Sequence, residues 1–481
     1  MPPNKTSKET DARLDSVQQE ADAVIHRMIP LDYYDKKKQF NEVCKITGIK
    51  EFGIKETKLV LRYLNSLLGV THLKGTDQLY IYNHNGYYEL LDDWLLQMLF
   101  RHLFSKAEYL WRPKIESVVL SEFKRSIETE VSAFDCQNCL NLRNGILSLD
   151  SEKLESHTAE NTLFTSVLDY DFNPKAQAPL FEKFIAETCC GDEELVTVMQ
   201  EIFGYCLSIS VKAEKAFFFY GTGCNGKSVI AKVLQGLIGA ENTCAVSLDA
   251  LNAPFAMSAF INKRVNIAAE NEAMPNSEKL KTLISCDRIN IPIKYREDWT
   301  GILYTKHVFL MNTLPATKDV SNGFFRKIMI IPFNNIVPKA KIDRDLLAKL
   351  LAERPGILNW ALAGYKRLAG NAFRFSSASA VENAMTQYCN QENPTGVFFH
   401  STYVRDPNCS ILKSALYDDY ILWAEANGAE RMTRSKFLTA LQLKASEPDS
   451  GIEWKIRQRR GYYYLVGYDY IEPAVQGGGA Q

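Results

Sequence analysis

The sequence predicts a multidomain α/β protein, and three observations support this fold class. The chain has 481 residues, of which 46% are hydrophobic, so it is too long for one hydrophobic core and too apolar to be disordered. An apolar strand pattern, a glycine-rich loop and an amphipathic helix pattern follow one another over residues 215–239, as in a strand–helix unit of an α/β core. Further short apolar runs that end in polar residues follow this unit, and helical patterns flank it on both sides.

Three segments precede the glycine-rich loop. Residues 1–28 are mostly polar and charged, which indicates a flexible leader. Residues 29–134 combine helical patterns with a hairpin pattern around a His-Asn-Gly turn, and we expect a small α+β module there. Residues 135–210 are expected to form a hairpin that turns at Asn144 and Gly145, followed by two amphipathic helices.

Three further segments complete the chain. Residues 211–390 contain the glycine-rich loop, the apolar strands and a set of helices, and form the expected core. A polar stretch at 390–395 separates this core from a last module at 391–472. Residues 473–481 include a glycine run and are expected to be a disordered tail.

The charge balance excludes a uniformly basic protein. Fifty-six lysines and arginines face 57 acidic residues, which leaves a formal net charge of −1. A nucleic-acid partner must therefore be argued from local clusters of cations rather than from the total.

The cysteine content and the polar start of the chain predict a cytoplasmic protein. The chain has eleven cysteines, an odd number, and its start lacks the apolar segment of a secretory leader. This combination favours reduced intracellular thiols over a disulfide framework. The sequence contains no apolar run long enough to span a membrane, so we expect no membrane-spanning helix. Cys136 and Cys139 form one C-x-x-C pair, but a second pair or a histidine pair at short spacing does not follow, so we expect no zinc site.

The glycine-rich loop predicts a nucleotide site for ATP and Mg²⁺. The pattern G-x-x-x-x-G-K-[ST] is filled in a strand–loop–helix context. Glycines let backbone N–H groups close around phosphate oxygens, the lysine reaches the β and γ phosphates, and the hydroxyl binds magnesium. The nucleotide-binding residues are predicted to be Gly221, Gly223, Asn225, Gly226, Lys227 and Ser228.

Hydrolysis requires further polar groups at the ends of neighbouring strands. The apolar run 265–269 ends at Glu270, with Glu272 two residues on, and either glutamate could activate water; Glu270 is also a candidate magnesium ligand with Ser228. Asn312 ends the next strand pattern, where it could orient the attacking water. Arg326 precedes another strand and could reach the γ-phosphate of a neighbouring subunit; a surface ion pair is the alternative.

The order of these motifs resembles the phage and plasmid primase-helicase family and its poxvirus relatives, which belong to the superfamily 3 helicases of the AAA+ group. The resemblance is strong over residues 135–335, moderate in the last module and hardly detectable in the first 130 residues. The matching stretches are NLRNGILSL, DYDFNPKA, QEIFGYCLSI, YGTGCNGKS, IAAENE, LKTLISCDRINI, FLMNTLP and FFRKIMIIPF.

The resemblance implies an AAA+ phosphate-loop ATPase core over 211–390 and a helicase-associated region with a helical collar over 135–210. It implies a homo-hexameric ring that pulls one DNA strand through its centre. Lys227 and Ser228 take the phosphate-loop roles, Glu270 the acidic role and Asn312 the sensor role, with Arg326 as the finger. Two departures are visible: the acidic motif reads E-N-E instead of two adjacent carboxylates, and Lys327 stands where the family often has a second arginine.

The resemblance also implies a hairpin that projects into the ring channel and grips DNA. The corresponding stretch is INIPIKYREDWTGILYTKHVFL, with Trp299 at the expected tip. Cations for phosphates and an aromatic ring for bases suit tracking on a single strand, whereas the alternative is a solvated hairpin with ordinary surface charges. The candidate DNA contacts are Lys294, Arg296, Trp299, Lys306 and His307.

The last module has the element order of a winged helix, with two helices followed by a basic hairpin. Alternation places Lys455, Arg457 and Arg459 on one face of a strand, where phosphates would relieve their mutual repulsion. A basic edge strand that prevents aggregation is the alternative. The predicted duplex contacts are Arg434, Lys436, Lys455, Arg457, Arg459 and Arg460.

Primer synthesis is not expected from this chain. It requires a carboxylate cluster for two metals, and Asp169 and Asp171 are explained by a turn at Asn173 and Pro174. A separate primase or polymerase is therefore a candidate partner.

The sequence thus predicts an ATP-dependent replicative DNA helicase of a phage or mobile genetic element in a bacterial host. Its DNA partners would be single-stranded and forked DNA, with the origin duplex as a further candidate, and no membrane. One rival is an origin-binding initiator that uses ATP only as an assembly switch. A second rival is an AAA+ remodeller that acts on protein.

Overall fold

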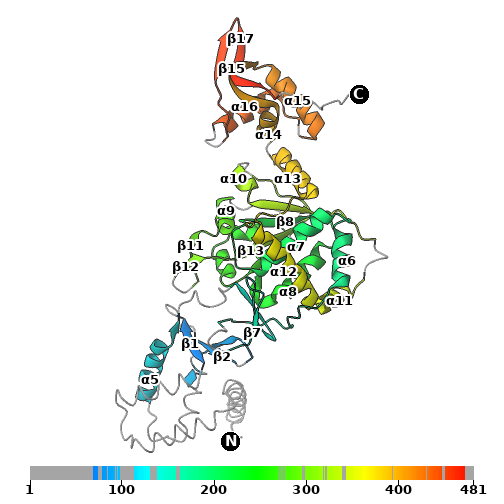
Figure 1. Ribbon diagram of the computed structural model, residues 1–481. Helices are drawn as coiled ribbons and strands as arrows, with labels where there is room; N and C mark the ends of the chain where they lie inside the picture. The colour runs from blue at the N-terminus through cyan, green and yellow to red at the C-terminus, as the bar shows by residue number, and fades with distance from the viewer. Residues whose placement is uncertain are drawn as a thin grey trace, which may run out of the picture.

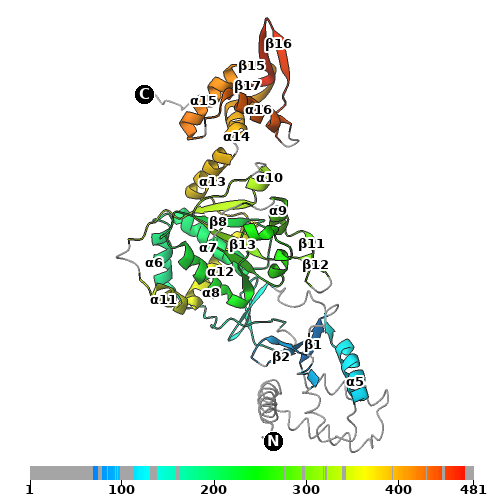
Figure 2. The same ribbon diagram turned by 180° about the vertical axis from the view of Figure 1, so that it is seen from behind.

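The computed structural model describes three parts that follow one another along the chain (Figures 1 and 2). Strands β1 to β3 and helix α5 lie at one end, the α/β core lies in the middle, and strands β15 to β17 lie at the opposite end. The described residues are 69–73, 79–83, 85–92, 94, 96–97, 113–129, 138–158, 163–269, 271, 274, 277–294, 298–317, 319, 322–338, 343–392, 394–429, 431–446 and 450–471.

A five-stranded parallel sheet forms the centre of the core. Its strands lie in the order β14-β8-β13-β10-β9, and every neighbouring pair is parallel. The three strands β14, β8 and β13 are buried almost throughout, as expected for a sheet covered on both faces. The strands are β8 (Ala216–Tyr220), β9 (Thr243–Cys244), β10 (Val265–Ala268), β13 (Lys306–Met311) and β14 (Ile328–Pro332). The predicted α/β class with several domains is confirmed.

Alternation along β8 sends its side chains into two separate hydrophobic clusters. Phe217 and Phe219 pack into a cluster with the helices on one face, and Phe218 packs into a second cluster on the other face. The first face is covered by α6 (Pro179–Thr188), α7 (Glu193–Leu207), α8 (Lys227–Ile238), α11 (Leu346–Ala352) and α12 (Arg354–Gly370). The second face is covered by α9 (Ser277–Ser285), α10 (Asn322–Phe325), α13 (Ser379–Glu392) and the short 3-10 helices Asp249–Asn252 and Ala256–Phe260. A further 3-10 turn, Ala240–Asn242, leads from α8 to β9.

Two glycines allow α7 and α12 to pack backbone against backbone. A Cβ atom on Gly364 would lie 2.1 Å from the carbonyl oxygen of Gln200, and one on Gly204 would lie 2.2 Å from the nitrogen of Tyr365. Gly370 ends the same helix α12, and a Cβ atom there would meet no other atom within 4 Å.

We expect Gly364→Ala to lower the free energy of unfolding by about 1–3 kcal/mol, because the helices must separate to admit the methyl group. Gly370→Ala is the matched control and should leave that free energy within about 0.5 kcal/mol of the parent value. Urea unfolding followed by circular dichroism measures both, and equal effects of the two substitutions would show that the helix crossing is not tightly packed.

The hairpin ahead of the core is present, with a turn that differs by one residue from the prediction. Strands β5 (Cys139–Leu142) and β6 (Gly145–Ser148) pair antiparallel, with Leu142 opposite Gly145, and β7 (Leu154–Glu155) adds a third strand. The turn residues are therefore Arg143 and Asn144, and Gly145 is the first residue of β6 with a φ of +147°.

Asp169 and Asp171 each have a cationic partner. Arg354 forms an ion pair with Asp169, and Arg143 Nε donates to Asp171 Oδ1 at 2.8 Å. These hydrogen bonds lower the pKa of both carboxyl groups. The pairs give both aspartates a role in joining segments of the fold.

The N-terminal part contains the predicted hairpin within a four-stranded sheet of order β3-β2-β1-β4. Its elements are β1 (Val70–Leu73), β2 (Leu79–Tyr82), β3 (Tyr88–Leu91), α5 (Pro113–Ser126) and β4 (Glu128–Thr129). The predicted leader at 1–28 and the tail at 473–481 lie outside the described residues. Across the described chain, no helix is both long and apolar enough to cross a membrane.

The C-terminal module has one strand that the sequence analysis missed. The first of the two predicted helices begins at Ala415, because the preceding Ser410 and Ile411 pair with Val466 and Leu465 of the last strand. Within the polar stretch at 390–395, α13 ends at Glu392 and α14 begins at Pro394. The elements are α14 (Pro394–Thr402), β15 (Tyr403–Leu412), α15 (Ala415–Asn427), α16 (Arg434–Ala445), β16 (Ile456–Arg459) and β17 (Tyr462–Tyr470), with sheet order β15-β17-β16.

Candidate nucleotide-binding site

The glycine-rich loop leaves β8 at the carboxyl edge of the parallel sheet and enters α8. A Cβ atom on Gly221 would lie 2.4 Å from Asn225 Nδ2 and 2.4 Å from the Phe333 carbonyl oxygen, so only glycine fits there. Gly223 and Gly226 have φ values of +105° and +84°, which side chains disfavour. The loop thus needs glycine at these positions for its own shape, as a phosphate-binding loop does.

Two hydrogen bonds fix the loop against the chain that follows β14. Asn225 Nδ2 donates to the Phe333 carbonyl at 3.0 Å, and the Cys224 carbonyl accepts from the Val337 amide at 2.9 Å. Asn225 is itself buried, with 3% of its surface exposed. Because neighbouring segments of the chain hold the loop, its shape is preorganised for binding.

Lys227, the first residue of α8, is a buried cation surrounded by neutral oxygen atoms. Only 5% of its surface is exposed. Its Nζ donates to Gly221 O at 2.5 Å and Asn225 Oδ1 at 3.1 Å, and more weakly to Asn312 Oδ1 at 3.4 Å. No carboxylate of the described residues pairs with it, and desolvation lowers its pKa. A buried ammonium group without a counter-ion is a position where an anion would be stabilised.

The neighbouring groups fit a nucleotide phosphate with a magnesium ion. Ser228 is exposed at the second position of α8, beside Lys227. The N-terminal end of α8 presents unpaired backbone N–H groups and the positive end of the helix dipole. Lys227 and the loop amides would hold the phosphates, and the Ser228 hydroxyl is a ligand type that magnesium accepts.

Asn312, at the end of one strand, lies beside Lys227, at the start of helix α8. Asn312 directly follows β13, which lies beside β8 in the sheet. On its other side β13 pairs with β10, so that Ala268 lies opposite Phe309. Glu270 and Glu272, which follow β10 in sequence, lie outside the described residues.

Asn271 is a structural residue that the sequence analysis did not single out. It is 2% exposed, its Oδ1 accepts from the Leu248 amide at 2.8 Å, and its Nδ2 donates to the carbonyls of Ala268 and Leu310 at 2.9 and 3.0 Å. The amide therefore ties β10 to β13 where both strands end. In the sequence, this residue is marked only by its place in the middle of the E-N-E motif. The bridging role gives a physical reason for an amide side chain between the two glutamates.

Arg326 and Lys327 differ sharply in their surroundings. Lys327 is 7% exposed and donates to Glu214 Oε2 at 2.7 Å and to Ser285 Oγ at 2.5 Å. Arg326 is exposed, and its backbone carbonyl accepts from the Lys215 ammonium group. Its guanidinium has no ion pair with any described residue, so the surface ion pair considered as its alternative role is not seen in that part of the chain. Lys327 is held by contacts within its own chain.

Two of the predicted channel residues are buried, and their assignment to DNA is wrong. Lys306 and His307 are 2% and 1% exposed and begin the central strand β13. Lys306 Nζ donates to the carbonyls of Ser208 and Tyr304 at 2.6 and 2.9 Å, and desolvation lowers its pKa to about 7. A side chain enclosed in this way cannot reach a DNA strand.

Trp299 is also not at the tip of the predicted hairpin. Strands β11 (Arg288–Ile291) and β12 (Trp299–Ile302) pair so that Trp299 lies opposite Ile291. The indole ring lies over Gly301 and packs against the hydrophobic cluster beneath the sheet. The ring therefore packs against the core at the last strand pair before the connection. Lys294 is exposed in the connection between the strands, and Arg296 lies outside the described residues.

His307 is buried between two aromatic rings, and neither of its ring nitrogens has a hydrogen-bond partner among the described residues. Burial, with a smaller contribution from the charge of Lys306, lowers its pKa to about 3. Below pH 6.5 this histidine binds a proton in the unfolded chain but stays neutral in the folded chain. The free energy of unfolding therefore falls as the pH decreases from about 6.5 to about 3.

We expect His307→Phe to raise the free energy of unfolding by about 1–3 kcal/mol at neutral pH, because an unsatisfied buried N–H group is removed. The acid-induced loss of stability should also become smaller. Urea unfolding at pH 7.5 and pH 5 measures both effects. Loss of DNA affinity in this variant, with the fold intact, would restore the predicted DNA contact.

The cations predicted in the C-terminal module are all exposed. Arg434 and Lys436 lie in the first turn of α16, and Arg457 and Arg459 lie on β16. Lys455 precedes that strand, and Arg460 is in the following turn, so the predicted alternation along one strand holds only for the two arginines.

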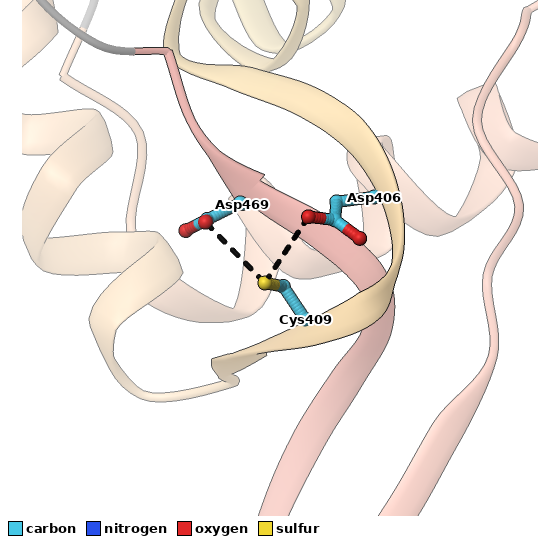
Figure 3. Close-up of side chains that lie close together, drawn as sticks. All are labelled: Asp406, Cys409 and Asp469. Carbon is cyan, nitrogen blue, oxygen red and sulfur yellow. Dashed lines mark hydrogen bonds between the residues drawn. The ribbon is translucent and has the colours of Figure 1, made fainter.

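A cysteine and two aspartates in this module are close enough to hold a metal ion (Figure 3). Cys409 Sγ lies 3.4 Å from Asp406 Oδ2 and 3.3 Å from Asp469 Oδ2. Hydrogen bonding to the two carboxylates raises the thiol pKa to about 11. At neutral pH the thiol is therefore a protonated hydrogen-bond donor, and the cluster is explained by its own hydrogen bonds.

Two family models match separate parts of the chain. Residues 33–190 match the family described as D5 N terminal like, and residues 219–326 match a family of unknown function, DUF5906. The first match begins well before the motifs at 135–335, so it includes a stretch in which the sequence analysis found almost no resemblance. The second match covers the glycine-rich loop and ends at Arg326.

Solved structures share the fold over most of the chain. The apo structure of the NrS-1 C terminal region (305-718) has a TM-score of 0.51 at 13% identity, and the A form apo structure of this region has a TM-score of 0.50 at 14% identity. Each comparison covers 84% of this chain and 97% of the other chain. The shared fold and the D5-type match support the resemblance of this chain to the phage primase-helicase proteins.

Proposed function

We propose that this chain is an ATP-dependent replicative DNA helicase of a phage or mobile genetic element, acting as a hexameric ring on single-stranded and forked DNA. The observation that supports it most is the position of Lys227. A buried ammonium group in a glycine-shaped loop, whose bonds to described residues all go to neutral oxygen atoms, is suited to a polyphosphate.

The chain supplies position and charge at this site. ATP with Mg²⁺ supplies, when bound, the phosphoryl group whose transfer to water releases energy. Lys227 exchanges its hydrogen bonds to Gly221 and Asn312 for phosphate oxygens, and its charge stabilises the negative charge that develops there. Asn312, released from Lys227, orients the attacking water, and Ser228 with Glu270 would ligate the metal ion.

The arginine that completes the site is proposed to come from a neighbouring subunit. Arg326 is exposed and has no ion pair among the described residues. A guanidinium group offers a planar set of donors that matches phosphate oxygens. A site built in this way hydrolyses ATP only in the assembled ring.

The C-terminal module is proposed to be a winged-helix domain that contacts DNA. Helix, strand, two helices and a hairpin follow one another in this order, and exposed cations lie on α16 and on the hairpin. Phosphate contacts by such cations position a protein on DNA. A separate primase or polymerase would supply the primers.

ATP hydrolysis measured with and without single-stranded DNA tests this function against the rivals. A helicase should show turnover that DNA stimulates severalfold. Turnover that DNA does not change would favour a remodeller of proteins, and DNA-dependent assembly without multiple turnovers would favour the initiator that uses ATP as a switch.

A further inference from the structure

The hairpin of β16 and β17 forms a narrow tip that projects beyond the helices of the C-terminal module, on the side away from the core (Figures 1 and 2). Arg459 pairs with Tyr462, so that only Arg460 and Gly461 form the turn. Both turn residues have positive φ, +48° and +82°, as in the tight turn preferred by two-residue hairpins. The side chains at the tip are therefore held by a short, ordered turn.

The hairpin carries an uncompensated positive charge. Residues 454–468 contain four cations and no acidic residue. All four cations are exposed, and none forms an ion pair with a described residue. Acidic residues stand on both sides of this stretch, where Glu453 pairs with Arg405 and Asp469 accepts from Cys409, but none lies within it. Like charges so close repel, and an anionic partner would relieve the repulsion.

Three consecutive tyrosines stand directly beside these cations. Tyr462 is 61% exposed and Tyr463 is 52% exposed. The register places Tyr462 and Tyr464 on the face of Arg459 and Arg457, whereas Tyr463 is on the opposite face. No hydrogen bond or ring contact joins these three side chains to other described residues.

Other tyrosines of the module are used inside it. The rings of Tyr403 and Tyr468 pack against Phe399, and the ring of Tyr420 stacks on Phe437 with 4.4 Å between centroids. Tyr470, at the far end of β17, donates to Asp419 at 3.0 Å. The tyrosines at the tip thus contribute little to this packing, and exposed aromatic rings are a mark of binding surfaces.

The cations alone could protect an edge strand from aggregation, since β16 is at the edge of its sheet. That role does not explain the tyrosines, because exposed aromatic rings on an edge favour aggregation. An anionic partner with flat apolar groups explains both residue types at once.

From this arrangement we infer that the hairpin tip binds unpaired nucleotides of a DNA strand, with bases stacked on Tyr462 on one face of the tip and on Tyr463 on the other, and with phosphates bound by the arginines. This inference rests on the proposed function and deepens it, because it assigns the tip to single-stranded DNA at a fork rather than to the duplex. Stacking requires a free base face, which a paired and stacked duplex does not offer to a side chain.

The test compares the full chain with the double variants Tyr462→Ala/Tyr463→Ala and Tyr462→Phe/Tyr463→Phe. Affinities for a fluorescent oligothymidylate and for a blunt duplex of equal length are measured by anisotropy without nucleotide. The alanine variant should bind the single strand about tenfold more weakly and the duplex unchanged, whereas the phenylalanine variant, which keeps the rings, should bind both as the parent does.

A second measurement locates the contact. Photo-crosslinking of an oligothymidylate that carries 5-iodouracil should label the peptide that contains Tyr462 and Tyr463. Replacing Arg457, Arg459 and Arg460 by glutamine should also reduce the slope of log affinity against log salt by about 2 for single strands.

The outcomes separate the inference from the proposed function. If the parent binds single strands but the alanine variant binds them equally well, or loses duplex binding to the same extent, the tip does not stack on unpaired bases and only this inference fails. If the parent binds neither DNA while the chain is folded and hydrolyses ATP, the proposed helicase function fails as well.

Discussion

Lys227→Ala is expected to reduce ATP hydrolysis by about a hundredfold or more, because the only buried ammonium group of the loop would no longer stabilise charge on the transferred phosphoryl group. The fold should survive. Among the described residues the lysine donates to neutral oxygen atoms, and two of these three acceptors belong to the loop itself. Phosphate release from ATP, measured beside circular dichroism, reports both properties.

Lys232→Ala is the matched control for this substitution. Lys232 lies on the same helix α8 but is exposed, so its loss should leave the turnover unchanged. Full turnover in the Lys227 variant would contradict the assignment of the loop to a nucleotide. Equal losses in both variants would instead indicate a general effect of helix α8.

Arg326→Ala is expected to lower ATP hydrolysis by about a thousandfold with no change in the melting temperature. The guanidinium has no ion pair with a described residue, so its removal leaves no buried charge behind. Arg326→Lys should recover little of the activity, since an ammonium group does not offer the forked donor set. The neighbouring Lys327 gives a contrast: it is buried and ion-paired, so Lys327→Ala should lower the melting temperature.

Mixing Arg326→Ala subunits with Lys227→Ala subunits shows where the arginine acts. In a randomly mixed ring, about one quarter of the interfaces would combine an intact Lys227 with an intact Arg326 from the neighbour. Hydrolysis should therefore return in part, although each variant alone is inactive. Absence of recovery at any mixing ratio would place Arg326 outside the neighbour's site.

The core of the fold could be predicted because its local signals agree with its burial. The strands β8 and β14 are apolar runs, and both are buried between two layers of helices. The loop between Gly221 and Ser228 was also predictable, because its glycines are required by the backbone itself and not by distant contacts.

The failures have a common physical cause, which is that tertiary contacts override local patterns. Lys306 and His307 are polar residues that look like surface residues, yet they begin the central strand and are buried on all sides. Strand β15 was missed because Asp406, Pro407 and Asn408 interrupt its pattern. Its pairing with β17 shifts register between Arg405 and Ser410, and a strand with such an irregularity has no regular alternation.

Strand displacement from a forked DNA duplex is the most direct measurement of the proposed helicase activity. A fork labelled with a fluorophore and a quencher is mixed with the chain, Mg²⁺ and ATP, and compared with the Lys227→Ala variant and with a non-hydrolysable ATP analogue. We expect displacement by the parent chain with ATP and none in either control. A chain that hydrolyses ATP and binds the fork, but leaves its strands paired, would contradict the helicase function and favour an initiator.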